Sequence, residues 1–484
     1  MYEKKNRQSQ KQIQFVALDD LVPKDHILRA IDEAIDFSFI YDEVEGMYST
    51  SQKGNLGVDP VSLFKIVFIQ YLFGIRSMRQ TIREIDVNVA YRWFIGYGLM
   101  ESVPHFTTFG KNYKRRFEGT DIFERVFYRI LDEAQKAGFV DTSAIFIDGT
   151  HIKANANRNK KERVKVDQTI KNYQQELEKE IDADRKKHGK KPTKKGPKPP
   201  SGKSICKSKT DPESGLFVKG EHERCFAYVA NTACDKNNFI LDFVVGAGNI
   251  HDSQMFHGVY KKLDKYNDTN EVVAVDAGYK TPAIMREIIK NGKIPSVPYK
   301  RPMTKQGFFR KYEYVYDEYY DCMICPANQV LKYSTTNKEG YREYKSDAKT
   351  CKNCSLLSQC TNSKNCVKVI TSHVWSKYME LAEEYRYVPK YRDIYKLRSQ
   401  TIERVFADAK EKHAMRYTRM SGLEKIKLQV TLTFACMNLK KLAMWKKKKR
   451  KLPPAVSSSL TFLMKKFILR LNFVDKYDES TCCG

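Results

Sequence analysis

The chain lacks an apolar run long enough to cross a membrane. Its most apolar stretch, Pro60 to Ile75, is shorter than the roughly 18 to 20 residues that a crossing requires, and it contains Lys65. With Asp59 as N-cap and Pro60 at the first helical position, the stretch predicts a buried helix. The first residues are basic but lack the apolar core of a secretory signal. The sequence therefore predicts a cytoplasmic protein.

Acidic residues are scarce relative to basic ones. The 484 residues include 58 Asp and Glu against 86 Lys and Arg, which gives a formal net charge of +28. Because nucleic acids reward many Lys and Arg contacts by releasing counterions, this excess favours DNA or RNA as a partner, with a membrane surface second. A basic tail that serves solubility alone is the simpler alternative. Hydrophobic residues still make up 41% of the chain, so extended disorder is excluded and two or three globular domains are expected.

Strand signals are nearly absent before residue 140, where apolar residues recur at helical spacing. From Ser143 onward, short β-branched runs alternate with helical segments, which favours an α/β core. Two insertions interrupt this core, one rich in Lys and Pro and one rich in Cys. The predicted divisions are a helical N-terminal region at 1–140, the first part of the core at 141–304 with a basic insertion at 158–203, a cysteine-rich insertion at 305–370, the last core helices at 371–445, and a basic tail at 446–484.

Three carboxylates stand out by their positions. Asp148 ends the run Ala-Ile-Phe-Ile-Asp, Asp276 ends a second β run, and Glu403 lies on a helix predicted to begin near Pro389. Side chains at strand ends can converge on one pocket, and carboxylates are the ligands that Mg²⁺ prefers. Three acids from separate segments would suit a two-metal site for phosphoryl transfer. The alternative is that both Asp residues cap turns and Glu403 is ordinary helix surface.

Cysteines cluster in the second insertion. Cys322 and Cys325 are separated by two residues, as are Cys351 and Cys354, and Cys360 follows. In a reducing compartment, paired Cys-x2-Cys units predict a structural Zn²⁺ site, because each unit can place two sulfurs on one tetrahedral face. Free thiols in a surface insertion are the alternative.

Several segments resemble the DDE transposases of bacterial insertion sequences. They are the stretch from Phe146 to Lys160, the stretch from Val272 to Pro282, and the stretch from Tyr395 onward. The resemblance covers about residues 15 to 445. Within these transposases, the chain most resembles the group that carries a Tyr-Arg-Glu-Lys signature. This resemblance implies an RNase H-like catalytic core in which Asp148, Asp276 and Glu403 are the catalytic residues and hold Mg²⁺ or Mn²⁺.

The signature maps onto Tyr395, Arg398, Glu403 and Lys410, with one extra residue between Arg and Glu. On a continuous helix this offset would turn Arg398 about 140° away from Glu403. Related transposases favour Cys325, Cys351, Cys354 and Cys360 as zinc ligands, with Cys322 as a substitute. The expected DNA contacts are Tyr395, Arg398 and Lys410 near the acids and Arg79, Arg83, Arg92, Lys114 and Arg115 in the helical region that the resemblance assigns to terminal-repeat recognition.

The implied activity is metal-dependent cleavage of double-stranded DNA at the ends of an insertion sequence, followed by strand transfer into target DNA. Such enzymes act as assemblies, so a homodimer or larger oligomer on DNA is expected, in the nucleoid of a bacterial cytoplasm. Two alternatives remain open from the sequence. One is a zinc-containing DNA-binding protein without catalysis, such as a domesticated or inactive copy, and the other is a nuclease of the same fold.

Overall fold

The computed structural model describes most of the chain. Most of the predicted basic tail, beyond residue 451, lies outside the described residues, as does the Pro- and Lys-rich end of the basic insertion. The described residues are 13, 15–48, 57–166, 173–193, 203–220, 223–301 and 304–451.

The chain forms two compact units. Unit 1 comprises Met1–Val140, Asp408–Met415 and Leu428–Gly484, and unit 2 comprises Asp141–Ala407 and Arg416–Lys427. The finer division predicted from the sequence, with a core interrupted by two insertions, stays a prediction.

Unit 1 is helical in its described residues, as the spacing of apolar residues predicts. Its long helix α4 begins as expected, since the Asp59 side chain accepts a hydrogen bond from the Ser62 amide at 2.7 Å and Pro60 occupies the first turn. The helices are α1 (Leu18–Leu21), α2 (Ile27–Asp32), α3 (Phe39–Val44), α4 (Pro60–Leu72), α5 (Met78–Val87), α6 (Val89–Ile95), α7 (Thr107–Asn112) and α8 (Ile122–Lys136), with short turns η2 (Glu45–Met47) and η3 (Tyr113–Phe117).

Aromatic rings fill the centre of unit 1. Phe64 of α4 packs against Phe68, Phe117 and Phe123, with ring centroids 5.5 to 6.3 Å apart. Such pairs add to the stability gained from burying their apolar area. This core fixes α4 and α8, and with them helix α5 and the turn η3, which carry several of the predicted basic contacts.

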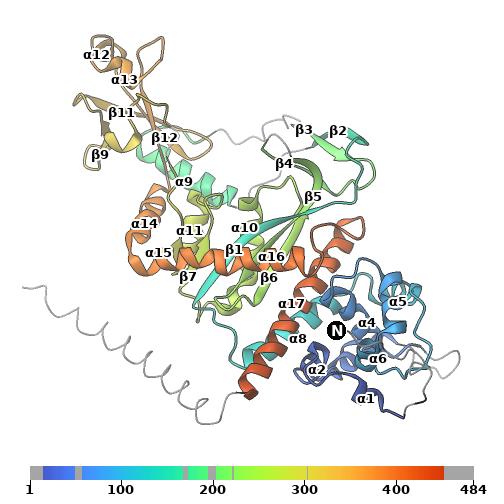
Figure 1. Ribbon diagram of the computed structural model, residues 1–484. Coiled ribbons are helices and arrows are strands. Elements are labelled where there is room, and N and C mark those ends of the chain that lie inside the picture. Colours follow the sequence, from blue (N-terminus) through green and yellow to red (C-terminus); the bar gives the residue numbers. More distant parts are fainter. Residues whose placement is uncertain are drawn as a thin grey trace, which may run out of the picture. The chain divides into compact units, whose positions relative to one another are not determined.

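Unit 2 contains a mixed eight-stranded sheet (Figure 1). Strand β5 pairs antiparallel with β1 on one side and with β4 and β6 on the other, whereas β1, β7 and β8 are parallel. The strands are β1 (Ala144–Lys153), β2 (Lys161–Val166), β3 (Lys203–Ser208), β4 (Gly215–Lys219), β5 (Glu223–Cys234), β6 (Ile240–Ala247), β7 (Val272–Val275) and β8 (Ile294–Ser296).

The predicted alternation of strands and helices is therefore confirmed, with one strand longer than expected. The strand expected to end at Asp148 continues to Lys153, because β1 keeps its pairing with β5 after its pairing with β7 has ended at Ile147. Helix α10 (Asp252–Lys262) packs against β1, β5 and β6, and α11 (Pro282–Lys290) packs against β8.

The cysteine-rich insertion forms a second, antiparallel sheet, which the sequence analysis did not predict. Helix α9 (Gln174–Lys187), from the basic insertion, is fixed to this sheet: Arg342 pairs with the buried Asp184, and His188 bonds to Asp321. The elements of the second sheet are β9 (Val315–Asp317), β10 (Cys322–Ile324), β11 (Val330–Thr336), β12 (Tyr341–Lys345) and β13 (Val369–His373), accompanied by η5 (Lys311–Glu313), α12 (Ala348–Lys352) and α13 (Leu357–Cys360).

The helix predicted to run on from Pro389 is interrupted, so that expectation is wrong. Helical geometry tightens over η6 and fails at Thr401, where φ is −110° and ψ is −102°, before α16 begins at Ile402. Arg398 and Glu403 therefore do not share one regular helix. The last elements are η4 (Asp264–Tyr266), α14 (Ser376–Tyr387), α15 (Pro389–Lys396), η6 (Leu397–Gln400), α16 (Ile402–Glu411) and α17 (Leu423–Lys451).

Candidate active site

Asp148 and Asp276 lie at the point where the two central parallel strands stop pairing. Ile147 is the register partner of Val275, the last residue of β7, so the next residue on each strand is one of the two acids. The carboxyl ends of parallel strands are the usual position for a binding site in a sheet of this kind. Each carboxylate is tied to local backbone, since Asp148 accepts from the Gly149 amide at 2.8 Å and Asp276 from the Gly278 amide at 2.6 Å.

Burial and nearby charge set the ionisation of Asp148. The pKa of this carboxyl is raised to about 6, chiefly by burial and also by the charges of Asp276 and Asp252, while Arg398 and the Gly149 amide lower it. A carboxylate held in a partly dry site beside other acids favours the binding of a compensating cation.

Arg398 supplies part of that positive charge. Its side chain is buried, and it donates to Oδ2 of Asp148 at 2.5 Å and to the Tyr395 hydroxyl at 3.5 Å. The break at Thr401 allows this arrangement, because it frees Arg398 from the helical face that a continuous helix would impose. The signature arginine, predicted as a DNA contact, is thus a buried partner of the first acid in this structure and is not exposed.

The other signature residues lie on α15 and α16. Burial raises the pKa of the Tyr395 hydroxyl; Arg398 lowers it, whereas the charges of Asp276 and Glu403 raise it, so this ring lies within electrostatic reach of two of the three acids. Glu403 is exposed in the first turn of α16, and Lys410 occupies the last turn of the same helix.

No cluster among the described residues is already arranged as a metal centre. In the part of the chain that the structure describes, no three or more His, Cys, Asp or Glu side chains are grouped closely enough to form a metal centre as they stand. The donor chemistry around Asp148 nevertheless fits a hard divalent cation, because the side chains that meet there are carboxylates and one buried oxygen, Oδ1 of Asp252, has no hydrogen-bond partner.

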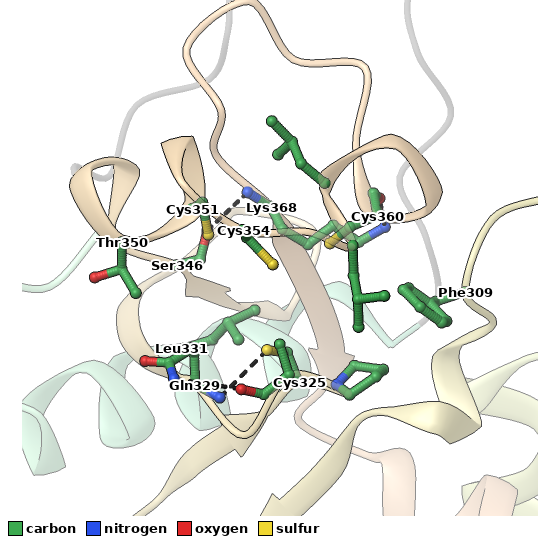
Figure 2. Close-up of a pocket in the computed structure, with 14 residues that line it drawn as sticks. Phe309, Cys325, Gln329, Leu331, Ser346, Thr350, Cys351, Cys354, Cys360 and Lys368 are labelled. Carbon is green, nitrogen blue, oxygen red and sulfur yellow. Dashed lines mark hydrogen bonds between the residues drawn. The ribbon is translucent and has the colours of Figure 1, made fainter.

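Four cysteines of the second insertion line one small cavity of about 30 Å³, enough for a single ion or water molecule. Figure 2 shows Cys325 on the opposite side of this cavity from the other three, Cys351, Cys354 and Cys360. The Cys325 sulfur accepts from the Gln329 amide at 3.3 Å. Cys322 does not line the cavity and is buried on β10.

The basic residues predicted in unit 1 fall into two groups. Arg79 and Arg83 are exposed on α5, and Lys114 and Arg115 line an open groove together with Phe106 and with Lys111, which the sequence analysis missed. Arg79 also stacks over the Phe106 ring at 4.4 Å. These exposed cations and the aromatic ring form a surface suited to a polyanion.

Arg92 belongs to neither of these two groups, and its prediction as a DNA contact is corrected. Its side chain is buried and donates to the carbonyls of Asp86, Gly98 and Glu101 at 2.8 to 3.1 Å. A guanidinium whose donors are taken up by backbone oxygens holds the loop after α6 and has little left to offer a phosphate.

Two family models match the chain. Residues 16–115 match a model described as transposase domain (DUF772), and residues 324–443 match one described as transposase DDE domain. The first match includes the basic groove of unit 1, and the second includes Glu403 and most of the cysteine-rich insertion. No curated protein matches the chain.

The mixed α/β fold with a helical N-terminal region and these two matches support a transposase function, and transposase domains imply binding to DNA. More narrowly, the two matches together support the predicted resemblance to the DDE-type transposases of insertion sequences. This family typically uses a divalent metal. None of the described helices combines the length and apolar character that a membrane crossing requires.

Proposed function

We propose that this transposase cuts DNA at the ends of an insertion sequence and joins the freed 3′ ends to target DNA, with Asp148, Asp276 and Glu403 holding divalent metal ions. The observation that carries the proposal is the side-by-side placement of Asp148 and Asp276 where the pairing of β1 and β7 ends. Glu403 follows on α16, beyond a break that gives it an orientation independent of Arg398.

The core sheet supports an RNase H-like fold. Numbered in chain order, the strands β1, β5, β6, β7 and β8 lie in the order 3-2-1-4-5, with the first three antiparallel. Asp148 is then on the first core strand and Asp276 directly after the fourth, which are the positions that the resemblance implies.

Residues of this chain would bind and orient the reacting groups. Bound Mg²⁺ or Mn²⁺ would activate the attacking oxygen and stabilise the leaving oxygen. Asp148 is held rigidly because β1 remains paired to β5 on both sides of it. Arg398 neutralises this carboxylate and is fixed by Tyr395. Lys410, two turns beyond Glu403 on α16, is proposed to contact a DNA phosphate.

The test uses the purified full-length chain and duplex DNA that ends in the element's own terminal repeats. Products are separated after incubation with Mg²⁺ or with a chelator, and DNA binding is measured in parallel. Metal-dependent nicking at the repeat ends and joined products support the proposal. Nicking without joining would indicate a nuclease, and binding without any cut would indicate a DNA-binding protein without catalysis.

The same site predicts a pH dependence of metal binding. Burial raises the pKa of Asp148 to about 6, so a proton must leave this carboxyl before a cation can bind at lower pH. Affinity for Mn²⁺ should therefore be constant above about pH 7 and about tenfold weaker at pH 5. Titration calorimetry of the metal-binding step without DNA measures this, and an affinity that is equal at pH 5 and pH 7 would contradict the assignment.

We also propose that the groove beside α7 binds the phosphates of terminal-repeat DNA. Reversing Lys114 and Arg115 to Glu should weaken DNA binding at least about tenfold near 0.1 M salt and reduce its salt dependence, because phosphate contacts release counterions. A matched control reverses the exposed Lys24 and Lys136 of the same unit, which changes the net charge equally. Equal loss in both variants would show a general charge effect and no groove.

Structural zinc bound by Cys325, Cys351, Cys354 and Cys360 is part of the same proposal, supported by their shared cavity. The assembly on DNA is proposed to be at least a dimer, since two element ends must be handled together.

A further inference from the structure

Asp252, the first residue of α10, brings a fourth carboxylate to the backbone beside Asp148. A Cβ added at Gly149 would lie 2.8 Å from Cγ of Asp252 and closer still to its Oδ1. The carboxylate therefore packs directly against the residue that follows Asp148 on β1. Only glycine leaves this room, because any side chain at position 149 would collide with the carboxylate.

The charges of three acids overlap at this point. The carboxylates of Asp148 and Asp252 lie within electrostatic reach of each other, and both are within reach of Asp276. The Tyr279 hydroxyl is buried beside all three, and among the charges acting on it that of Asp252 is the largest. Like charges held this close repel one another unless a cation compensates them.

Two buried oxygen atoms nearby have no hydrogen-bond donor. One is Oδ1 of Asp252, and the other is Oδ1 of Asn231, whose residue is 0% exposed. Asn231 is the register partner of Gly149 on β5, and its Nδ2 donates to the Tyr279 hydroxyl at 2.6 Å. Buried acceptors without donors are costly, and their presence beside three carboxylates indicates a place for a cation with its bound water.

The position of Asp252 at a helix start has a simpler structural explanation, which the contacts do not favour. Acids in a first turn often stabilise a helix through its dipole or as its cap. Here the capping bond is made by the preceding residue, since Nδ1 of His251 accepts from the Ser253 amide at 3.2 Å. The Oδ1 atom of Asp252 is turned into the interior at Gly149 and makes no capping bond.

We propose that Asp252 is a fourth carboxylate of the divalent-metal site and that Gly149 is the residue that admits it. This inference rests on the proposed function, in which Asp148 and Asp276 hold the metal. Asp252 would bind the cation directly or through one of its water molecules, and Asn231 would accept a hydrogen bond from that water.

The test measures Mn²⁺ binding to the full-length protein without DNA, by titration calorimetry and by the loss of the free-ion electron paramagnetic resonance signal. Asp252→Asn keeps the shape of the side chain and removes its charge, and it should weaken Mn²⁺ binding by a factor on the order of 10 to 100. The control Asp264→Asn removes an equal charge from the exposed turn beyond the other end of α10 and should leave the affinity unchanged.

Melting of the metal-free protein separates a ligand from a structural acid. Removing one of three mutually repelling charges should leave the melting temperature of Asp252→Asn unchanged or raised, while the rise produced by Mn²⁺ becomes smaller. A lower melting temperature with unchanged Mn²⁺ affinity would overturn the inference in favour of a helix-start role.

The Mn²⁺ measurements distinguish failure of the Asp252 inference from failure of the metal-dependent function. If wild type binds Mn²⁺, Asp148→Asn loses it and Asp252→Asn retains it, the metal site stands and the fourth carboxylate is refuted. If wild type binds no Mn²⁺ in either measurement, the metal-dependent function itself fails, and the inference about Asp252 fails with it.

Discussion

Asp148→Asn should lower the rate of Mg²⁺-dependent cleavage at element ends by a factor on the order of 10³ or more while DNA binding persists. The substitution removes the charge of the carboxylate that the central sheet holds most rigidly, and an amide is a poor ligand for Mg²⁺. Single-turnover cleavage of a terminal-repeat duplex, with binding measured by fluorescence anisotropy, would separate the two effects.

A second variant guards against a loss of folding. Asp148→Asn leaves Arg398 buried without its anionic partner, which is itself destabilising. Glu403 is exposed, so Glu403→Gln should abolish cleavage with an unchanged melting temperature. Asp132→Asn, at an exposed position of α8, is the matched control. Full cleavage by the Glu403 variant would exclude this residue from the catalytic set.

Cys354→Ser should release zinc and unfold the cysteine-rich insertion. A structural zinc site contributes on the order of 10 kcal/mol to the stability of a small module, and losing one thiolate removes much of it. We expect about one zinc ion per wild-type chain by elemental analysis, much less in the variant, and rapid proteolysis that begins within residues 305–370. We expect zinc loss to unfold the insertion because four thiols line one cavity there.

Cys366→Ser is the control within the same insertion, because Cys366 does not line the cavity. It should keep both the zinc and the resistance to protease. The competing explanation treats the cysteines as small apolar residues, since Cys325 and Cys360 pack against the cluster around Tyr314 and Leu331. Wild-type protein that contains no zinc, and a stable Cys354 variant, would support that explanation.

The sequence allows Asp148 and Asp276 to be predicted because each follows a short run of buried β-branched and apolar residues, which is recognisable from the sequence alone. Their adjacency depends on the register of β1 against β7, and only the folded sheet shows it. Asp252 could not be predicted in the same way, since an acid in the first turn of a helix is common and usually structural. Its contact with Gly149 is visible only in the folded structure.

The errors have a common physical origin. The segment around Thr401 contains neither Pro nor Gly, so local preferences favour an unbroken helix, and tertiary contacts of Arg398 with Asp148 accompany the break. Arg92 likewise has the charge of a DNA contact, yet its donors are used by loop carbonyls that periodicity does not reveal. The contacts of polar residues are harder to predict than those of apolar ones, because one polar side chain can bind solvent, a ligand or the backbone.

The docking of α9 on the second sheet has a consequence for how this chain could have been assembled and how it can be shortened. Asp184 and Thr336 are hydrogen-bonded although they are 152 positions apart, and Trp375 packs against Leu177 and Ile181 of the same helix. Helix α9 of the first insertion and the sheet of the second thus form one folded unit, and neither part is complete without the other. Removing the cysteine-rich insertion alone would leave the buried Asp184 without Thr336 and Arg342, and removing α9 would uncover the Trp375 ring, so a shortened chain that loses both insertions must also replace Trp375.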